Sequence, residues 1–489
     1  MSTTSGTTGQ ARPDAPAGLA VELNALNTID ESERHGKPRD LFWPWFAANV
    51  SVFGLAYGAY LLAFGVSFWQ AVLVGTVGIV VSFLFCGFIS LAGRRGSAPT
   101  MVLSRAAFGV EGNRLPSFLS WILTVGWETV LVTLATLATA TVLGELGWGG
   151  GTVTQAVTLV VVAGIVMAAG IFGFDLVMRL QRVITILTAV LTVVYVFLVI
   201  DHVDWAAVSS IPGGGAPQVV GGLVFMMTGF GLGWVNMAAD YSRYLPRNAS
   251  GPGVVGWTTF GGALPPVLLV VAGLLLAGSD PALATAIGND PIGALSTILP
   301  TWFLIPFAVV AIAGLVGGAA LDIYSSGLAL LSLGLPAPRW VAALVDGVLM
   351  VLGAIYLVFV ADTFFFPFQG FLITLGVPIA AWCGVLLADI LLRRRDYADA
   401  ELYDRRGRYG SVRWLAVGLV VVGTVIGWGL VTNTYAEWLG WQGYLLGPDD
   451  GAFRAEWGGA NLGVLFALVI GFVGTLVGSA GTVRRQEAR

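Results

Sequence analysis

The sequence predicts an all-α, polytopic membrane protein with about twelve transmembrane helices. Hydrophobic residues make up 56% of the 489 residues and charged residues only 11%, a balance that excludes an ordinary soluble protein. The apolar residues are gathered into stretches of roughly 20 residues or more, the length that a helix needs to cross a bilayer. The basic residues fall between alternate stretches, as expected for a chain that crosses a membrane repeatedly.

The predicted spans follow a polar tail. Residues 1–40 are rich in Ser, Thr, Gly and Pro and contain no apolar core, which predicts a flexible cytoplasmic tail without a cleavable signal peptide. The first six spans are 41–64, 67–92, 115–143, 155–178, 182–200 and 217–241. The other six are 254–277, 300–330, 340–361, 366–392, 413–434 and 460–481. A basic loop follows the tenth span at 396–412, and residues 482–489 form a short second tail.

The distribution of charge predicts the topology. Of the 24 basic residues, all but Arg454 fall on one side of the predicted membrane. Loops rich in Lys and Arg remain in the cytoplasm. We therefore expect a multi-pass protein of the cell membrane with both termini in the cytoplasm.

Several classes of function lack the residues that they need. Lys37 is the only lysine and lies in the tail, so there is no phosphate-binding loop and no ATP-driven pump is expected. The only histidines are His35 and His202, and no HExxH or GxSxG motif is present, so no enzyme and no metal site are expected. Cys86 and Cys383 both fall in apolar spans, which predicts no disulfide. No selectivity-filter sequence of a channel, no cofactor and no nucleic-acid partner are predicted.

The sixth span is interrupted by glycines at alternate positions. The residues concerned are Gly229, Gly231 and Gly233, with Phe230 and Trp234 set among them and Asp240 and Arg243 at the end. Glycine costs a helix about 1 kcal/mol relative to alanine, so an unbroken helix is hard to maintain here. Broken helices near the midplane are where secondary transporters bind substrate, whereas small residues can also simply let helices pack closely. The aromatic residues and the Asp–Arg ending favour a break, with Gly229, Gly233, Asp240 and Arg243 in gating or structural roles.

The first span contains a second candidate break. Asn49 and Ser51 are followed there by Gly54 and Gly58. An inverted repeat would pair this span with the sixth, and Asn49 would then lie near the substrate. From the first span alone, a glycine packing face explains the same residues equally well.

Carboxylates lie deep in several predicted spans. Glu128 is near the middle of the third span and Asp322 near the middle of the eighth, and ionisable residues so placed are functional candidates. Asp346 in the ninth span has the alternative of a hydrogen-bonding partner across helices. Asp389 and Asp175 lie near basic clusters at cytoplasmic ends, where ion pairing or interfacial solvation explains them.

Two of these carboxylates suit proton coupling. In a five-plus-five inverted repeat the third and eighth spans are symmetry mates, so Glu128 and Asp322 would approach the centre from opposite sides. Burial disfavours a charged carboxylate, so such a group can take up and release a proton as water access alternates. The membrane potential is worth roughly 2.3 kcal/mol per elementary charge per 100 mV, enough to drive accumulation of a solute.

The chain resembles the nucleobase–cation symporters, the purine–cytosine permease and allantoin/hydantoin transporter group, from Leu41 to about Arg395. The most specific mark is the end of the sixth span, Gly233-Trp234 followed by Ala239-Asp240-Tyr241-Ser242-Arg243-Tyr244-Leu245-Pro246. Supporting marks are Trp45-Phe46-Ala47-Ala48-Asn49, Ser104-Arg105 with Phe108-Gly109, Gly126-Trp127, Asp322-Ile323-Tyr324-Ser325 and Ala388-Asp389.

The resemblance implies a fold and a mechanism. It implies ten core helices in a leucine-transporter-type inverted repeat, with 41–200 as the first repeat and 217–395 as the second. Two peripheral helices over 413–481 complete the chain, and transport proceeds by alternating access. A flat heterocycle would be imported by cation symport.

The resemblance also implies where the heterocycle stacks. It lies between aromatic residues of the third and sixth spans, and Trp127 matches the first of these. On the sixth span the stacking position falls at Gly231, next to Phe230, while Trp234 matches the tryptophan of the fungal-like branch, so the choice of ring stays open. Asp322 stands where the family has an asparagine that hydrogen-bonds the heterocycle. A carboxylate there can accept from the N–H groups of cytosine, adenine or guanine.

One departure from the family concerns the coupling ion. Sodium-coupled members carry Ser and Thr hydroxyls on the eighth span, where this chain has Ala313, Val316 and Gly317. These side chains offer no oxygen, and a hard cation needs oxygen ligands. We therefore expect proton coupling, with sodium as the alternative.

The nearest rival is an amino-acid or other small-solute cation symporter on the same fold. A zwitterion needs a free helix N-terminus for its carboxylate, whereas a neutral heterocycle needs rings to stack on. The aromatic residues named above favour the heterocycle. The expected partners are this small molecule and the lipid bilayer, for a monomer or a weak homo-oligomer.

Overall fold

The structure is a computed structural model that describes residues 28–172, 174–333, 339–433 and 437–488. Every regular element in these ranges is helical. The long helices are α3 (Phe68–Arg95), α6 (Arg114–Glu145), α7 (Thr152–Phe172), α8 (Phe174–Leu198), α12 (Gly251–Ser279), α15 (Thr301–Ser332), α16 (Arg339–Phe359), α17 (Phe365–Leu392) and α20 (Gly463–Ala488). The intermediate ones are α1 (Phe42–Asn49), α2 (Phe53–Leu62), α10 (Ala216–Gly229), α13 (Pro281–Asn289) and α18 (Trp414–Trp428). The short ones are α4 (Thr100–Leu103), α5 (Arg105–Phe108), α9 (Trp205–Ser210), α11 (Gly231–Trp234), α14 (Pro291–Thr297) and α19 (Ala452–Trp457).

Each predicted span corresponds to a helix or to a broken pair of helices, but the count of twelve is not confirmed. In the described ranges, nine helices are long and apolar enough to cross a membrane, or up to ten if the bent pair α1–α2 forms one span. The described apolar part of α8, Val183–Leu198, and the 15 residues of α18 are shorter. The predicted boundary between the fourth and fifth spans is wrong, because α7 ends at Phe172 and α8 begins at Phe174. Arginine is a good helix former, so Arg179 and Arg182 continue α8 instead of ending a span.

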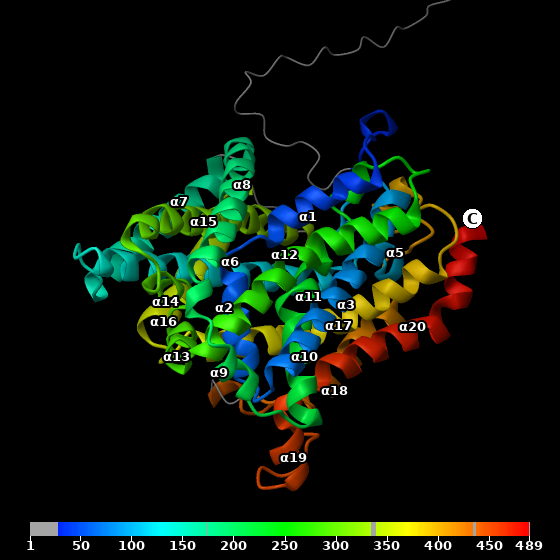
Figure 1. The fold of residues 1–489 in the computed structure, drawn as a ribbon. Coiled ribbons are helices and arrows are strands. Elements are labelled where there is room, and N and C mark those ends of the chain that lie inside the picture. Colours follow the sequence, from blue (N-terminus) through cyan, green and yellow to red (C-terminus); the bar gives the residue numbers. More distant parts are fainter. Residues whose placement is uncertain (1–27, 173, 334–338, 434–436, 489) are drawn as a thin grey trace, which may run out of the picture.

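The helices pack as two groups joined by α17. The first group contains α1, α2, α3, α10, α11 and α12, and the second contains α6, α7, α8, α15 and α16. The second group lies on the left of Figure 1, and α18 and α20 pack against α17 on the right. Helix α17 contacts α3, α10 and α11 of the first group and α6 of the second. Helix α17 therefore contacts both halves of the broken sixth span and one helix of the second group.

Glycines let helices of the first group pack with their backbones in direct contact. A methyl group added at Gly58 of α2 would lie 2.2 Å from the backbone nitrogen of Leu274, and one added at Gly273 of α12 would lie 1.8 Å from the carbonyl oxygen of Leu55. Without a hydrophobic drive between helices in lipid, close contact between small residues stabilises their association. Gly58 thus has the packing role that the sequence left open.

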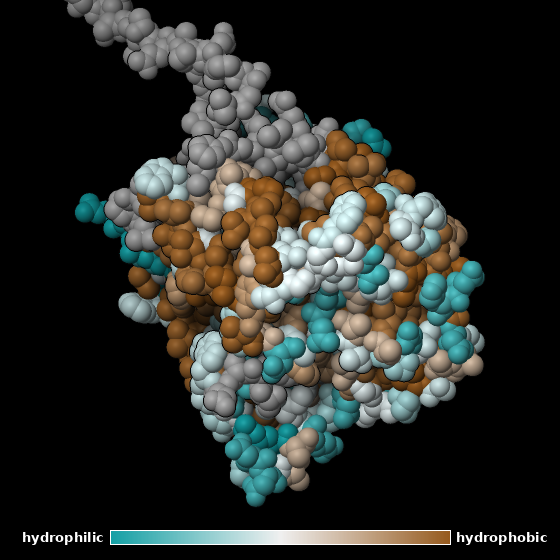
Figure 2. Space-filling model, turned by 90° about the vertical axis from the view of Figure 1, so that its left-hand side faces the viewer, coloured by the Kyte–Doolittle hydropathy of each residue, from teal (hydrophilic) through white to brown (hydrophobic). Residues whose placement is uncertain are grey.

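The lateral surface matches a bilayer. Figure 2 shows the left-hand side of the molecule of Figure 1, with large hydrophobic patches on its left and upper parts and mostly hydrophilic side chains at its lower end. Exposed apolar residues on α7 and α8 are Val153, Val157, Val160, Val161, Ile165, Val183, Ile186, Leu187, Val190, Val193 and Phe197. Aliphatic side chains exposed in such numbers indicate contact with lipid.

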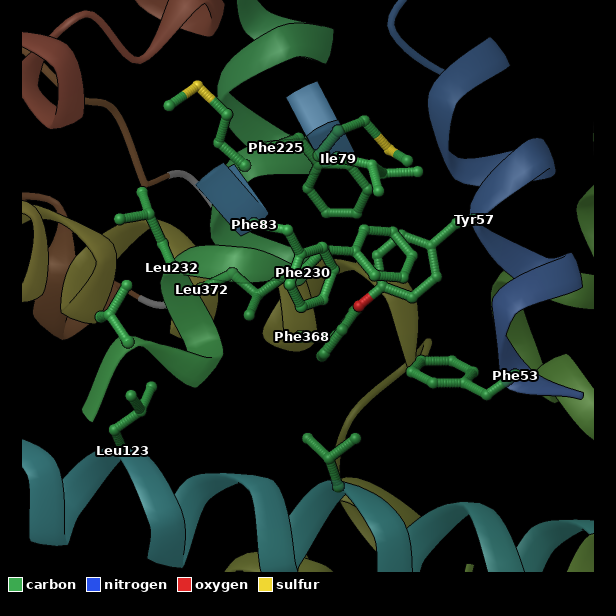
Figure 3. Close-up of a cluster of buried hydrophobic side chains, with 14 of the residues drawn as sticks. Phe53, Tyr57, Ile79, Phe83, Leu123, Phe225, Phe230, Leu232, Phe368 and Leu372 are labelled. Carbon is green, nitrogen blue, oxygen red and sulfur yellow. The ribbon is translucent and has the colours of Figure 1, made fainter. Parts of the chain in front are cut away.

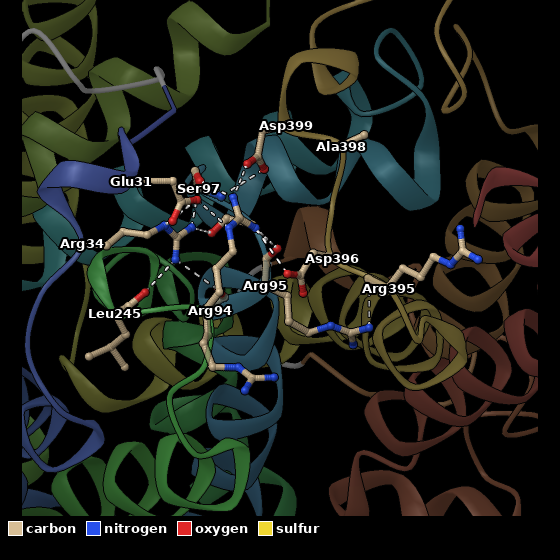
Figure 4. A network of polar contacts seen from close by, with 12 residues as sticks. Glu31, Arg34, Arg94, Arg95, Ser97, Leu245, Arg395, Asp396, Ala398 and Asp399 are labelled. Atoms are coloured by element: carbon tan, nitrogen blue, oxygen red, sulfur yellow. Dashed lines mark hydrogen bonds and ion pairs between the residues drawn. The ribbon is translucent and has the colours of Figure 1, made fainter. Parts of the chain in front are cut away.

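Arginines hold one end of the molecule together, which we call the arginine end (Figure 4). Arg34 donates to the carbonyl oxygen of Leu245 at 2.6 Å, and Arg95 to that of Arg393 at 2.7 Å. Arg247 pairs with Glu31 at 2.6 Å and with Asp399 at 2.8 Å. The hydrogen bond from Arg247 lowers the pKa of the Glu31 carboxyl.

These contacts correct the prediction of a flexible tail over residues 1–40. Residues 28–40 pack on the arginine end, where the backbone N–H of Ile29 donates to the carbonyl oxygen of Ser97 at 2.8 Å and the Ile29 side chain is buried. The polar composition predicted disorder, but the buried side chain of Ile29 and the hydrogen bonds of Arg34 hold residues 28–40 against the helices. Residues 1–27 lie outside the described residues.

Asp389 and Arg393 form a buried ion pair at the arginine end of α17, which is one of the two explanations that the sequence offered for Asp389. Two of the guanidinium nitrogens donate to the carboxylate, at 2.6 and 2.9 Å, and both side chains are 3% exposed. Arg393 also donates to the carbonyl oxygen of Ala106 and to Gln486 of α20. The pair therefore joins α17, α5 and the last helix. The side chain of Asp175 lies outside the described residues.

Breaking this pair should destabilise the fold strongly. We expect Asp389→Asn to lower the free energy of unfolding by about 3–5 kcal/mol, because it leaves a buried guanidinium without its counter-charge. Thermal unfolding of the detergent-solubilised protein measures the loss. The matched control is Arg405→Gln, which removes a partner of Glu111 from an exposed pair and should cost about 0–1 kcal/mol. Equal losses in the two variants would contradict the structural role of the buried pair.

Candidate functional site

Both candidate breaks are present. The first span bends by 70° between α1 and α2. In the sixth span α10 ends at Gly229, Phe230 adopts a non-helical backbone (φ −119°, ψ −108°), and α11 begins at Gly231. The breaks face each other in the first group, next to the second group.

Side chains of α2 and α3 satisfy the backbone groups freed at the second break. The N–H of Gly231 donates to Ser82 Oγ at 3.0 Å, and its carbonyl oxygen accepts from Cys86 Sγ at 3.2 Å. The Tyr57 hydroxyl donates to the carbonyl oxygen of Gly229 at 3.2 Å. Non-helical backbone at membrane depth persists only with such partners. Cys86 and Cys383 are free and buried, as predicted.

Gly231 lies on the α3 side of the break. A methyl group added there would be 2.2 Å from the carbonyl carbon of Ser82 and 2.5 Å from the nitrogen of Phe83. The residue therefore allows α11 to contact the backbone of α3. Gly231 therefore has a packing role against α3.

Phe230 belongs to an aromatic cluster shown in Figure 3. Its ring centroid lies 4.5 Å from that of Tyr57, and only 7% of the residue is exposed. Phe53, Phe225 and Phe368 complete this cluster around Tyr57. Phe368 comes from the first half of α17, so α17 covers the break from the side opposite the arginine end.

Trp127 reaches from the second group to the break. Its half-buried ring meets Phe368 edge-on at 5.8 Å and Phe371 at 6.1 Å. A methyl group added at Gly233 would lie 3.3 Å from Trp127 Nε1, so the indole sits beside the second half of the broken span. Gly233 therefore leaves room for the indole.

Trp234 and Asn49 lie toward the arginine end of the two breaks. Trp234 is half-buried and meets Trp45 of α1 edge-on at 6.3 Å, and Trp45 also meets Tyr241 at 5.8 Å. The buried amide of Asn49 donates to the carbonyl oxygen of Trp45 at 2.9 Å within its own helix. Trp234 thus faces the first break, whereas Phe230 faces α2 and α17.

Two carboxylates border the same space. Glu128 follows Trp127 on α6 and is fully buried; the Ser326 hydroxyl of α15 lies beside its carboxylate, and no cationic side chain pairs with it in the described part of the chain. Asp322 of α15 is half-buried and close enough to interact electrostatically with both Glu128 and Tyr241. A buried carboxylate without a counter-charge is costly when charged, which favours its protonated form.

Asp346 has the partners across helices that the sequence anticipated. Trp121 Nε1 of α6 donates to one of its oxygens at 2.7 Å, and the Ser326 hydroxyl of α15 donates to the other at 2.8 Å. Ser326 also lies beside Glu128. Asp346 therefore joins α16 to α6 and α15.

Asp240 and Arg243 connect the end of the sixth span to its neighbours. Asp240 accepts from both the backbone N–H and the hydroxyl of Thr100 at 2.8 Å, at the start of α4. The buried guanidinium of Arg243 lies over the ring of Tyr244 at 5.2 Å. Both contacts lie at the arginine end.

Sequence reasoning missed several residues of the site. Asn236, whose amide donates to Ser120 of α6 at 2.9 Å, links the two groups of helices. Tyr57, Phe368 and Phe371 surround the break. The aromatic run at the start of α17, Phe364-Phe365-Phe366-Pro367-Phe368, was the available signal. In the described ranges, no three His, Cys, Asp or Glu side chains gather as metal ligands would.

The sequence of the chain matches a known protein family and individual known proteins. Residues 28–447 match the family model for permeases of cytosine/purines, uracil, thiamine and allantoin. The YxlA protein of Bacillus subtilis (strain 168), provisionally named a purine-cytosine permease, is 24% identical over 414 residues, which are 81% of this chain and 85% of that protein. The purine-cytosine permease FCY2 of Saccharomyces cerevisiae is 27% identical over 246 residues, 48% of this chain and 44% of that protein.

Solved structures share the fold. The inward-facing conformation of Mhp1 has a TM-score of 0.70 at 18% identity and covers 96% of this chain and 94% of Mhp1. The closed conformation of Mhp1, a nucleobase-cation-symport-1 family transporter with bromovinylhydantoin bound, has a TM-score of 0.66 and covers 96% and 100%. A sodium-coupled sialic acid symporter has a TM-score of 0.51 at 13% identity. The fold is thus the leucine-transporter-type arrangement that the sequence predicted.

Proposed function

Because the chain belongs to the family of permeases for cytosine/purines, uracil, thiamine and allantoin, we propose that it imports a nucleobase or a related flat heterocycle by proton symport. It is a membrane transporter and not an enzyme. The solute would bind where the broken sixth span faces α6 and α15 and would cross by alternating access of that site to the two sides.

The observation that carries the proposal is the placement of Trp127 beside both a break and two carboxylates. The indole comes from the second group of helices and lies against Gly233 of the first. Glu128 and Asp322 border the same space without a counter-charge among their described contacts. A flat ring can therefore stack on Trp127 while its edge donates to a carboxylate.

The chemistry favours heterocycles with several N–H donors. Asp322 offers an acceptor oxygen in both its ionised and its protonated form, so it fits the amino groups of cytosine, adenine or guanine. Relatives of the chain are named purine-cytosine permeases, which supports the same class.

The side chains of the eighth span, α15, support proton coupling. On α15 the side chains of Ala313, Val316 and Gly317 provide no oxygen ligand for sodium. Glu128 and Asp322 are titratable and buried or half-buried at the centre. A proton taken up there from one side and released to the other would couple the solute to the membrane potential.

The arrangement of charge supports an orientation in the cell membrane. Arg34, Arg95, Arg247 and Arg393 gather at one end of the molecule, and Arg454 lies at the other, paired with Asp449. With the arginine end in the cytoplasm, both termini are cytoplasmic and α19 is on the outer side. The transport site lies within one chain, which suits a monomer or a weak homo-oligomer.

Uptake into proteoliposomes tests the proposal. Radiolabelled cytosine, adenine, guanine, uracil and allantoin would be offered under an imposed proton gradient or a sodium gradient separately. The expected result is uptake of an amino-bearing base under the proton gradient alone. Uptake under sodium alone would overturn the proton assignment and keep the substrate class. If no base moves under either gradient, the heterocycle assignment fails, and amino acids become the next solutes to test.

Removing the Trp127 ring should weaken binding of the transported base. Stacking of a base on an aromatic side chain is worth roughly 1–3 kcal/mol, so Trp127→Ala should raise KM about 5- to 150-fold. Trp127→Phe keeps a ring and should lose less. Concentration-dependent uptake measures both, with Trp441→Ala, an exposed ring near α19, as the control. Equal KM values for Trp127→Ala and the wild type would exclude the stacking role.

A further inference from the structure

A cavity opens at the end of the molecule opposite the arginine end. Its volume is about 410 Å³, within the range of small-molecule sites. Its walls combine aromatic rings, amides and a carboxylate, contributed by Phe64, Phe365, Gln218, Gln369, Glu456 and Asn461. Three walls come from the ends of α2, α10 and α17. The fourth comes from residues 455–461, in the segment that links the peripheral helices α18 and α20.

An aromatic layer separates this outer pocket from the central site. Phe365 lines the pocket and stacks on Tyr60, with ring centroids 4.6 Å apart. Phe225 and Phe368 lie behind it, and Phe368 in turn meets Trp127. A solute that approaches from this end therefore meets the pocket before it meets the layer that covers Trp127.

Polar groups of the pocket are available for a ligand. Asn461 is 3% exposed, and its Oδ1 has no hydrogen-bond partner within the described part of the chain, while its amide donates to the carbonyl oxygen of Gly459. A buried acceptor left unpaired costs about 1–3 kcal/mol. Asn461 also holds a left-handed backbone (φ 52°) at the end of a short helical turn, a position that asparagine and glycine favour. Glu456 is exposed and has no ion pair among the described residues.

We propose that this pocket is a second, outer binding site for a flat heterocycle with N–H donors, occupied before the solute crosses the aromatic layer. The proposal rests on the function proposed above. The ring would lie against Phe365, and its N–H groups would donate to Asn461 and Glu456. The segment between the peripheral helices thereby contributes directly to recognition of the solute.

A cysteine placed in the pocket tests the proposal. Gly459 lines the pocket, is exposed, and has open space for a side chain, whereas both native cysteines are buried. Purified Gly459→Cys would be labelled with a thiol-specific methanethiosulfonate reagent, alone and with cytosine, adenine, guanine, uracil or allantoin. With a base at about ten times its dissociation constant, the labelling rate should fall about tenfold. The matched control is Gly151→Cys, which is exposed at the same end, has equal open space, and lies outside the pocket.

A second variant separates binding in the outer pocket from closure of that pocket caused by a base bound at the central site. In the double variant Gly459→Cys with Trp127→Ala, which weakens binding at the central site, protection by cytosine or adenine should persist. Loss of protection there would show that central binding closes the pocket and would overturn the outer site. Failure of all five compounds to protect, or failure of the reagent to reach Gly459→Cys at all, would overturn it as well. Labelling needs no ion gradient, so a failure of transport in the wild type is recognised separately.

Substitutions in the walls identify the polar contacts. Asn461→Gly tolerates the left-handed backbone and removes the unpaired acceptor, and Glu456→Gln removes the charge. Each, made in Gly459→Cys, should raise the base concentration needed for half-protection several-fold. Asp450→Asn removes an exposed carboxylate of the same segment outside the pocket and should leave protection unchanged. Half-protection that is equal in all of these backgrounds would contradict the assigned contacts.

Discussion

Proteoliposomes that contain Asp322→Asn should take up base without concentrating it. In the wild type, one proton moved with each base at 100 mV supplies roughly 2.3 kcal/mol, which corresponds to about 50-fold accumulation. Asparagine can still hydrogen-bond a heterocycle but cannot carry the proton. We therefore expect the final ratio of inside to outside concentration to fall to about one, while exchange of labelled for unlabelled base continues.

Two carboxylates of α6 provide a test variant and a matched control for the same measurement. Glu128→Gln replaces the fully buried carboxylate of α6 and should also abolish accumulation, whereas Glu145→Gln changes the exposed carboxylate at the end of the same helix and should not. Accumulation that survives both Asp322→Asn and Glu128→Gln would exclude these groups as proton carriers. Accumulation lost only in Glu128→Gln would place the proton on α6 alone.

Gly231→Ala should disable transport by displacing the broken span. The added methyl would meet the backbone of α3 at 2.2 Å, and backbone atoms cannot turn aside as a side chain can. Overpacking of this kind costs typically about 1–3 kcal/mol, and here it acts where the freed N–H meets Ser82. We expect a lower melting temperature in detergent and an uptake rate at least about tenfold lower.

The control for this variant is Gly256→Ala. Gly256 lies in α12 of the same group of helices and has open space around it, so the methyl should be tolerated or slightly stabilising. If both variants melt and transport alike, the contact between α11 and α3 does not set the geometry of the break.

The local sequence predicted the breaks. It did not predict which neighbouring helix each residue of the break would contact. Gly229, Gly231 and Gly233 weaken a helix wherever they occur, so the interruption was readable. Gly231 meets α3, Gly233 meets Trp127, and Phe230 turns toward Tyr57, because three different helices approach the same turn. Contacts between segments more than a hundred residues apart leave no local pattern.

For the charged residues, too, some contacts were predictable from neighbouring sequence and others depended on distant segments. The basic cluster after Asp389 pointed to ion pairing or interfacial solvation, and the structure shows the ion pair with Arg393. By contrast, the order of residues 28–40 depends on carbonyl oxygens of α3 and of the chain after the sixth span, which accept from Arg34. Composition alone therefore gave the wrong expectation for that segment.

The sequence by itself determined the membrane class, the alternation of basic loops, the two interrupted spans and the family, because each of these is recorded in the composition or in residues adjacent along the chain. The tertiary structure alone decided that Phe368 and Phe371 meet Trp127, that Asp346 is bound by Trp121 and Ser326, and that the segment between the peripheral helices lines an outer pocket. These features depend on how helices distant in sequence cross, and the crossing is set by the fit of small and large side chains between them.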